Sequence, residues 1–261
     1  MRTTVYKLKS EKISKELKIA LVSDLHGETA KGVLEMLRKE TPDIIAIPGD
    51  ITSRLDLLDG EPSHDKMGII SHKNAFELLR EASRISKTYY SFGNHELCGH
   101  KYRKNSGHRC HAQNLSDIRK SGAVLLDDEY RVDGNIAIGG LTTGHTNADL
   151  APHTGWIEGF SAREEFKILL CHHPEYYERY LKNRDIDLIL AGHAHGGQIR
   201  LFGRGLFAPG QGVLPKYTSG VHNGRLVISK GLANTAGIIP RVFNPKELVI
   251  IKIEPQKGKI Y

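Results

Sequence analysis

The sequence contains few cysteines. Three occur among 261 residues, namely Cys98, Cys110 and Cys171. A small and odd number of cysteines does not build the disulfide framework on which small secreted domains depend. We therefore expect a chain that is stabilised by a hydrophobic core and that works in a reducing compartment.

Long apolar segments are absent as well. No stretch approaches the roughly 18 consecutive apolar residues that span a bilayer. The first residues, MRTTVYKLKSEKISKELK, are polar with mixed charge and lack the apolar centre of a secretory signal. These two absences predict a cytoplasmic protein without a transmembrane segment.

The bulk composition is that of a globular chain, with 39% hydrophobic and 26% charged residues. The length suits one large domain, so we expect a single domain over residues 1–261. The formal net charge of +7 favours anionic partners such as phosphates, nucleic acid or a membrane surface.

Five short apolar runs each end in polar side chains. Runs of about six Ile, Leu and Val residues bounded by Gly, Pro or Asp are typical of buried strands. Segments with helical periodicity lie between them, at residues 31–40, 72–85, 114–122 and 175–183. The alternation predicts an α/β fold. The polar residues at the five ends are Asp24 and His26, Asp50, Asn94 to Glu96, His172 and His173, and His193 and His195.

Ligands in α/β folds collect beyond the carboxyl ends of strands, so we expect the five ends to meet in one polar site. Residues two apart in an extended chain project to the same side. Each of the pairs Asp24/His26 and His193/His195 is therefore expected to reach one ion, with Gly192 letting the backbone come close.

The candidate ligands are oxygen and imidazole donors without thiolates, which argues against a structural zinc cluster. The set is Asp24, His26, Asp50, Asn94, His172, His193 and His195. Seven donors fit two ions with a bridging carboxylate, and Mn²⁺, Fe and Zn²⁺ all accept such donors. Two ions can hold a bridging hydroxide for in-line attack on a phosphoryl group. His95 is the candidate catalytic residue at the leaving oxygen, and Glu96 either orients it or faces solvent.

The ordered motifs DLH, PGD, GNHE, CHHP and GHAH resemble those of the calcineurin-like metallophosphoesterase superfamily. The resemblance runs from about residue 17 to 254. It implies a four-layer α/β/β/α sandwich of two mixed β-sheets flanked by helices. It also implies one ion held by Asp24, His26, Asp50 and His195, and a second held by Asp50, Asn94, His172 and His193. His172 is preferred to His173 because the family pattern is H-x-P.

The stretches 192–222 and 226–254 resemble the bacterial branch of UDP-2,3-diacylglucosamine diphosphatase-like phosphohydrolases. The resemblance implies a small phosphorylated substrate, nucleotide-like rather than a phosphoprotein. We therefore expect hydrolysis of a phosphodiester, phosphomonoester or diphosphate bond by a metal-bridging hydroxide.

Two other functions remain open at the level of sequence. A metal-dependent nuclease agrees with the positive charge, but the basic residues look dispersed rather than gathered in a stripe, which argues against nucleic acid. A non-catalytic scaffold of the same fold would normally lack ligands, whereas every ligand position here is filled.

Residues 98–114 combine cysteine, histidine and basic residues, and three interpretations compete. The segment is a solvated loop, a basic lip for a substrate phosphate, or an extra zinc site of Cys98, His100, Cys110 and His111. Elsewhere, His64, Asp65, His145 and His153 are expected on surface loops, and Trp156 and Phe160 in core packing.

Overall fold

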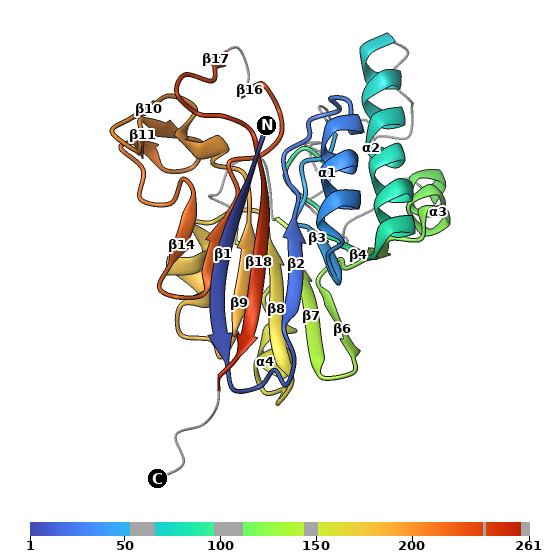
Figure 1. The fold of residues 1–261 in the computed structure, drawn as a ribbon, viewed down its shortest axis with the longest axis vertical. Coiled ribbons are helices and arrows are strands. Elements are labelled where there is room, and N and C mark those ends of the chain that lie inside the picture. The colour runs from blue at the N-terminus through green and yellow to red at the C-terminus, as the bar shows by residue number, and fades with distance from the viewer. Residues whose placement is uncertain (53–65, 97–111, 144–150, 237–238, 257–261) are drawn as a thin grey trace.

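The computed structural model describes residues 1–52, 66–96, 112–143, 151–236 and 239–256, and it contains two six-stranded sheets (Figure 1). The first has the order β1-β18-β2-β3-β4-β5. Its strands are β1 (Arg2–Ser10), β18 (Glu247–Pro255), β2 (Leu17–Leu21), β3 (Ile44–Ile47), β4 (Lys87–Tyr90) and β5 (Val124–Leu125). All neighbours are parallel except β18 and β2, so the sheet is mixed.

The second sheet has the order β14-β15-β9-β8-β7-β6. Its strands are β14 (Gly220–His222), β15 (Leu226–Ile228), β9 (Leu188–Ala191), β8 (Phe166–Cys171), β7 (Ile136–Leu141) and β6 (Glu129–Asp133). The three central pairs are parallel, and the outer pairs β14/β15 and β6/β7 are antiparallel. The second sheet is therefore mixed as well.

Apolar side chains alternate between two cores along each strand. In β2, Ile19 and Leu21 pack toward the second sheet, where they meet residues such as Leu170 of β8. Ala20 and the following Val22 pack instead toward the helices. This period of two, with both faces apolar, is what a strand buried on both sides requires.

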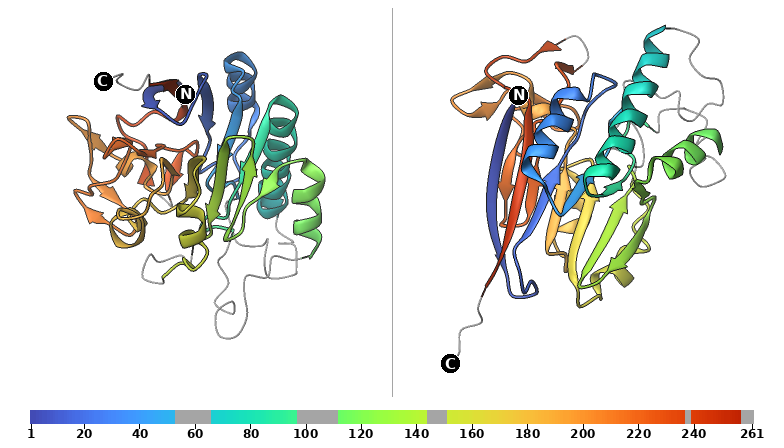
Figure 2. Two further views of the ribbon diagram at one scale, coloured as in Figure 1. Left: turned by 90° about the horizontal axis from the view of Figure 1, so that it is seen from below. Right: turned by 45° about the vertical axis from the view of Figure 1, so that its right-hand side comes forward.

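Helices cover the outer face of each sheet. Those on the first sheet are α1 (Lys31–Glu40), α2 (Lys66–Ile85) and α3 (Ala112–Ser121), which lie on one side of the molecule in Figure 2. Those on the second are α4 (Ile157–Ser161) and the π-helical turn η1 (Tyr177–Leu181). The predicted four-layer sandwich is confirmed.

The predicted elements are all present, with two differences. Helix α2 begins at Lys66, six residues before the predicted 72. The predicted helix over 175–183 is a short π turn, closed by a hydrogen bond from the Lys182 N–H to the Tyr177 carbonyl of 2.8 Å. The wider turn leaves both Tyr177 and Leu181 buried against the second sheet.

The region after η2 (His195–Gly197) was not predicted. It forms the short pairs β10 (Arg200–Leu201) with β11 (Arg204–Gly205), β12 (Phe207–Ala208) with β13 (Gly212–Val213), and β16 (Thr235–Ala236) with β17 (Ile239–Pro240). These pairs lie at the upper left of Figure 1, above the sheets.

Two further predictions concern packing and membrane crossing. Phe160 is fully buried in the outer core, and Trp156 packs against the same cluster, which confirms core packing for both. Within the described part of the chain, no helix has both the length and the apolar character needed to cross a bilayer.

Candidate metal centre

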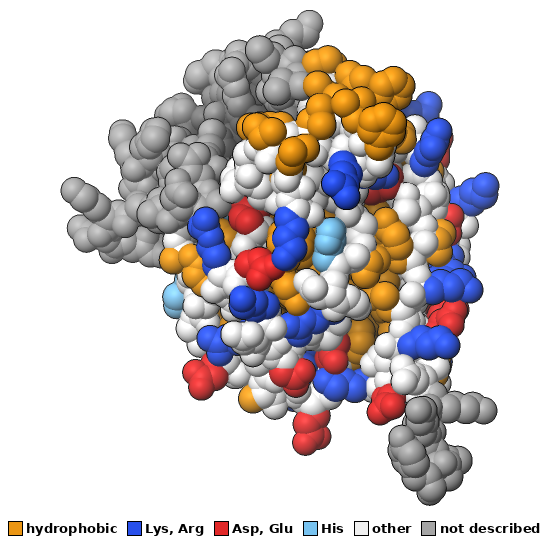
Figure 3. All heavy atoms as spheres, turned by 90° about the vertical axis from the view of Figure 1, so that its left-hand side faces the viewer, with side chains coloured by type: hydrophobic (Ala, Val, Ile, Leu, Met, Phe, Trp, Pro, Cys, Tyr) orange, Lys and Arg blue, Asp and Glu red, His pale blue; other side chains and the backbone are white. Residues whose placement is uncertain are grey.

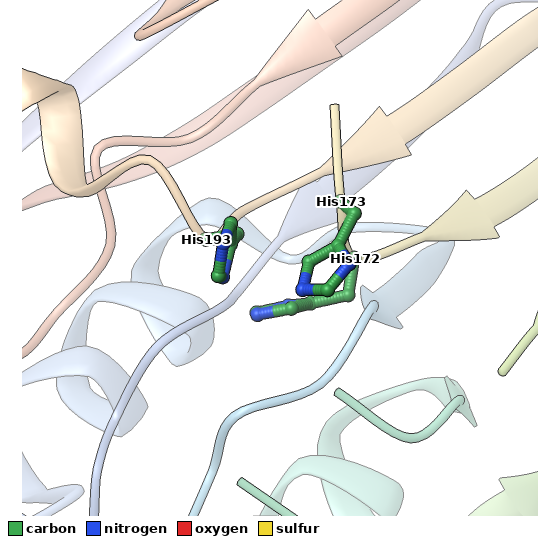
Figure 4. A group of neighbouring side chains, drawn as sticks. All are labelled: His172, His173 and His193. Carbon is green, nitrogen blue, oxygen red and sulfur yellow. The ribbon is translucent and has the colours of Figure 1, made fainter. Parts of the chain in front are cut away.

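The five strand ends meet at one edge of the sandwich. Strands β2, β3 and β4 are parallel neighbours, so the residues that follow them emerge together. Strands β8 and β9 are also parallel neighbours, and their ends bring His172, His173 and His193 together (Figure 4). Hydrogen bonds and ion-pair distances link the two sets across the sheets, as described below.

The backbone at this edge is left-handed at several candidate ligands. The φ angles are 53° at Asp24, 48° at His26, 54° at Asp50, 65° at His193 and 46° at His195. Positive φ is uncommon for residues other than glycine, and such strain concentrates at functional sites. The extended geometry on which the pairwise spacing argument depended is therefore wrong at these residues.

Two glycines let the carboxylates approach the backbone. A Cβ atom on Gly192 would lie 2.4 Å from Oδ2 of Asp24, and one on Gly93 would lie 2.3 Å from Oδ1 of Asp50. Both distances are far inside van der Waals contact, so any side chain at either position would displace a candidate ligand. This confirms that Gly192 is needed for close approach.

Asp24, His26 and His195 form the first group. The Nε2 atoms of His26 and His195 are 3.2 Å apart, and they lie 3.9 and 3.6 Å from Oδ1 of Asp24. The other oxygen of Asp24 accepts a hydrogen bond of 2.5 Å from the Ser23 hydroxyl. The first group thus gathers one carboxylate and two imidazoles around a common point.

His172, His173 and His193 form the second group, in which the ligand nitrogens lie within 4.8 Å of one another. Figure 4 shows the three rings converging, two from the end of β8 and one from beyond β9. The centroids of His173 and His193 are 4.0 Å apart. Asn94 joins the group because its Oδ1 lies 3.1 Å from Nε2 of His173. Both residues of the HH pair therefore reach the site.

Asp50 lies between the two groups. Its Oδ2 is 3.0 Å from Nε2 of His172 and 3.7 Å from Nε2 of His26. Its Oδ1 accepts a hydrogen bond of 2.8 Å from the backbone N–H of His95, whose imidazole lies 4.0 Å from Oδ2 and is one-third exposed. Asp50 thus contacts imidazoles of both groups, and the ring of His95 beside it is partly exposed to solvent.

The spacing argument placed His193 and His195 on one ion, and the structure separates them. His193 belongs to the second group and His195 to the first. The physical reason is the left-handed backbone at both residues, which turns the two side chains to different partners. Asp24 and His26, by contrast, fall in the same group as predicted.

Burial keeps most of the imidazoles neutral. It lowers the pKa of His26 and of His195 to about 3, and it lowers the pKa of His173 and of His193 well below its usual value. A neutral imidazole has a lone pair available for a metal ion, so these four side chains are in the protonation state that coordination requires.

His172 is the exception. Burial opposes its charge, but the nearby Asp50 carboxylate raises the pKa of His172 to about 9. His172 in turn holds the pKa of Asp50 well below its usual range, although burial acts in the other direction. Without a cation at this point, a proton on His172 compensates the buried carboxylate.

Glu96 is fully buried, so a solvent-facing role is wrong. Its carboxylate accepts hydrogen bonds from the backbone N–H groups of Asp50 (2.9 Å), Ile51 (2.8 Å) and Gly93 (2.7 Å). Burial raises the pKa of Glu96. The glutamate of GNHE therefore ties the turn that carries Asp50 to the turn that carries Asn94.

Three contributors to the site carry no motif that the sequence reveals. Asn244 donates a hydrogen bond of 2.6 Å from Nδ2 to the His195 carbonyl. Gly231 lies so close that a Cβ atom on it would be 2.7 Å from that of Asp24. The positive charge of Arg241 lowers the pKa of His195, and only the effect of burial is larger. All three come from the last third of the chain, after the final motif.

Several sequence predictions do not fall at the site. His64, Asp65, Cys98, His100, Cys110, His111 and His145 lie outside the described residues. His153 is exposed and lies 3.7 Å from Oδ2 of Asp128, which agrees with the expected surface connection. Cys171 is a buried free thiol at the end of β8.

Comparison with known proteins agrees with this geometry. The family model of the calcineurin-like phosphoesterases matches residues 17–197. An uncharacterized metallophosphoesterase of Campylobacter jejuni is 28% identical over 256 residues, which cover 94% of this chain and 61% of the relative. An uncharacterized metallophosphoesterase of Aquifex aeolicus is 26% identical over 275 residues, covering 99% and 93%.

A solved structure is also similar. The calcineurin-like phosphoesterase YfkN from Bacillus subtilis aligns over 90% of both chains, with a TM-score of 0.42 and 14% identity. The family model covers more than half of the chain and spans all five motifs. The chain therefore belongs to the calcineurin-like phosphoesterase family, a class of phosphohydrolases.

Proposed function

We propose that the chain is a dinuclear metal-dependent phosphoesterase that hydrolyses a P–O bond in a small phosphorylated substrate. Phosphodiesters, phosphomonoesters and diphosphates are the candidate bonds, with a nucleotide-like substrate favoured by the sequence resemblance. The observation that carries the proposal is the convergence of two imidazole groups on either side of the buried Asp50 carboxylate.

The donor atoms fit divalent cations. His172 is completely buried, yet neither of its ring nitrogens has a hydrogen-bond partner of good geometry. Nδ1 of His195 is buried and lacks such a partner as well. Buried polar atoms normally have hydrogen-bond partners. Imidazole nitrogens that lie near carboxylates without forming hydrogen bonds are therefore suited to bind a metal ion instead. The mixture of oxygen and nitrogen donors suits Mn²⁺, Fe or Zn²⁺.

The proposed ligands divide by group. The first ion would be held by Asp24, His26, Asp50 and His195, and the second by Asp50, Asn94, His172 and His193. When bound, such a pair of ions activates a water molecule and neutralises charge on the phosphoryl oxygens. The protein supplies the positions of the donors, which the buried turns around Gly93 and Gly192 fix.

His95 is proposed to give a proton to the leaving oxygen. Its backbone N–H is anchored on Asp50, and its ring stands edge-on to that of His26 at a centroid distance of 4.3 Å. The imidazole lies beside the ligands proposed for the first ion and is partly exposed, so it would be placed where a leaving group departs. The positive charge of Arg241, which acts on His195 of the first group, would favour an anionic substrate.

The proposal is tested with purified protein assayed on bis-p-nitrophenyl phosphate, p-nitrophenyl phosphate and a nucleoside diphosphate. We expect hydrolysis that a chelator abolishes and that added Mn²⁺ restores, and the three rates identify the preferred bond. Hydrolysis that persists after metal is stripped, in both the native chain and the Asp24→Ala variant, would refute the proposal.

The role of His95 predicts a dependence on the leaving group. Proton donation matters little for p-nitrophenolate and much for an alkoxide, so His95→Asn is expected to slow an alkyl ester by about a hundredfold more than an aryl ester. The comparison uses one variant with two substrates and needs no correction for folding. An equal loss on both esters would show that His95 is not the proton donor.

A further inference from the structure

The loops that follow the GHAH motif expose large hydrophobic side chains. Phe202 and Phe243 are 103% and 80% exposed, and Val213 and Leu214 are 77% and 69% exposed. Patches of this kind on a protein surface usually mark a site of interaction. The apolar face, as we name it, consists of Leu201, Phe202, Phe207, Val213, Leu214, Val242 and Phe243.

The apolar face is a single structural unit. The Arg200 N–H donates to the Val242 carbonyl at 3.0 Å, which fixes the loop of Phe243 beside the β10/β11 hairpin. The Leu214 N–H donates to the Leu206 carbonyl at 2.9 Å, which joins the second hairpin to the first. Figure 3 shows hydrophobic side chains gathered at one end of this side of the molecule, with Lys and Arg side chains beside them.

The same part of the chain carries all the net charge. Residues 188–246 contain seven Lys and Arg and no Asp or Glu, so the other 30 basic residues balance the 30 acidic ones. Three of the seven pair with carboxylates elsewhere, namely Lys216 with Glu178, Lys230 with Glu247 and Lys246 with Glu28. Within the described residues, the four arginines form no ion pair; they are Arg200, Arg204, Arg225 and Arg241.

A basic hollow of about 390 Å³ opens beside the apolar face. Arg200, Arg204, Lys216 and His222 line it, and Leu214 of the apolar face forms part of its wall. Arg200 donates to the Gly196 carbonyl at 2.7 Å, so its guanidinium is held in place. Exposed hydrophobic side chains and a hollow lined by basic residues thus lie side by side.

We propose that the apolar face docks onto a membrane surface that carries anionic phospholipids. Exposed aromatic and aliphatic side chains enter the interfacial layer, while Arg200, Arg204 and Lys216, which line the hollow, meet lipid phosphates. Interfacial binding grows with the apolar area that is buried and with attraction to anionic headgroups, and each basic residue near such a surface adds to it. Both requirements are met by one continuous set of loops.

A second copy of the chain is a poorer occupant. A symmetric dimer would place this face against itself, and that would oppose Arg200 and Arg204 of one copy to those of the other. No acidic side chain in residues 188–246 is available to compensate them. An anionic bilayer provides an apolar layer and negative charge together, which the composition of the face matches.

The test is cosedimentation of the full-length chain with vesicles of phosphatidylcholine alone or mixed with phosphatidylglycerol. We expect the chain to sediment with the mixed vesicles and to stay in solution with phosphatidylcholine. The double variant Phe202→Ser/Phe243→Ser is expected to lower the apparent affinity by about tenfold, because two inserted rings are lost. Arg204→Glu is expected to weaken binding as well.

Matched controls lie on other surfaces. Val132→Ser removes an exposed hydrophobic side chain from β6, and Arg119→Glu reverses an exposed charge on α3. Neither should change sedimentation. Failure of the native chain to bind mixed vesicles, or unchanged binding by the double variant, would overturn the proposal. A native dimer that the double variant dissociates in size-exclusion chromatography would also overturn it, because the face would then be covered by protein.

Discussion

The two groups of the candidate centre differ in how they carry charge. The first group contains its own carboxylate, Asp24, which His195 approaches to 3.6 Å. The second consists of three imidazoles and depends on Asp50, which His172 approaches to 3.0 Å. Divalent cations need negative charge near them, so the second group is expected to lose its ion when Asp50 is changed, whereas the first keeps Asp24. In the proposed dinuclear centre, Asp50 would therefore determine whether two ions are held.

The largest effect is expected for Asp50→Asn. The change removes the shared negative charge, so we expect the second ion to be lost, the first to bind weakly, and phosphodiester hydrolysis to fall on the order of a thousandfold. Metal analysis after gel filtration measures the number of ions bound, and the rate of phosphodiester hydrolysis measures the loss of activity. Asp43→Asn, an exposed carboxylate in the loop before β3, is the matched control. Full metal content in Asp50→Asn would contradict the bridging role.

His193→Asn and His195→Asn test the separation of the two groups. Each variant should retain one ion, because each removes a donor from a different group, and metal affinity at the affected position should fall by about ten- to a hundredfold. Added Mn²⁺ should partly restore both. The double variant should lose both ions; if it keeps one ion, the two histidines share the other, as the spacing argument predicted.

When metal is removed, His172 should respond to pH in the opposite direction from the other buried imidazoles. His26 and His195 have folded-state pKa values of about 3, below the ordinary 6.5, so the stability they contribute is present above pH 6.5 and lost as pH falls toward 3. The free energy of unfolding should fall by about 1.4 kcal/mol per pH unit for each histidine.

His172 has a raised pKa of about 9, so its contribution is present below pH 6.5 and lost as pH rises through 9. Urea unfolding of the stripped protein across this range measures both slopes. His195→Asn should flatten the acid slope and His172→Asn the alkaline one. An alkaline slope that His172→Asn leaves unchanged would mean that another group is responsible.

The smallest effect is expected for His173→Asn. Nε2 of His173 is already engaged with Asn94, whereas Nε2 of His172 is directed at the Asp50 carboxylate, 3.0 Å away. His172→Asn should therefore release the second ion, and His173→Asn should lower its affinity by no more than about tenfold. Isothermal titration with Mn²⁺ on both variants makes the comparison. A greater loss for His173→Asn would reverse the assignment made on the H-x-P pattern.

Much of the fold and of the site was predictable because both depend on strong local signals. Each strand that leads to the site is an apolar run followed by a polar residue. Because β2, β3 and β4 are parallel neighbours, the polar residues that follow them lie at one edge of the sheet. That His193 and His195 belong to different groups was not predictable from their spacing, since the residue type His does not by itself indicate a left-handed backbone. The role of Glu96 likewise depends on hydrogen bonds from the backbone of two separate turns, which residue types do not indicate.

The hairpins after η2 escaped prediction for a different reason. Strands of two residues, such as β10 and β12, are too short to show alternation, and the apolar residues between them are interrupted by glycine. Their position depends on contacts with distant residues, such as the close approach of Gly205 to Gly197. Sequence patterns carry no record of such contacts.

The order of the first sheet has a consequence for biosynthesis. Strand β18 lies between β1 and β2, pairing with β1 from Arg2↔Glu247 to Ser10↔Pro255 and with β2 on its other side. While the ribosome is still extending the chain, the N-terminal strand has no neighbour to join. We expect nascent chains that stop before residue 247 to keep an open seam along this sheet and to rely on chaperones until the last strand closes it.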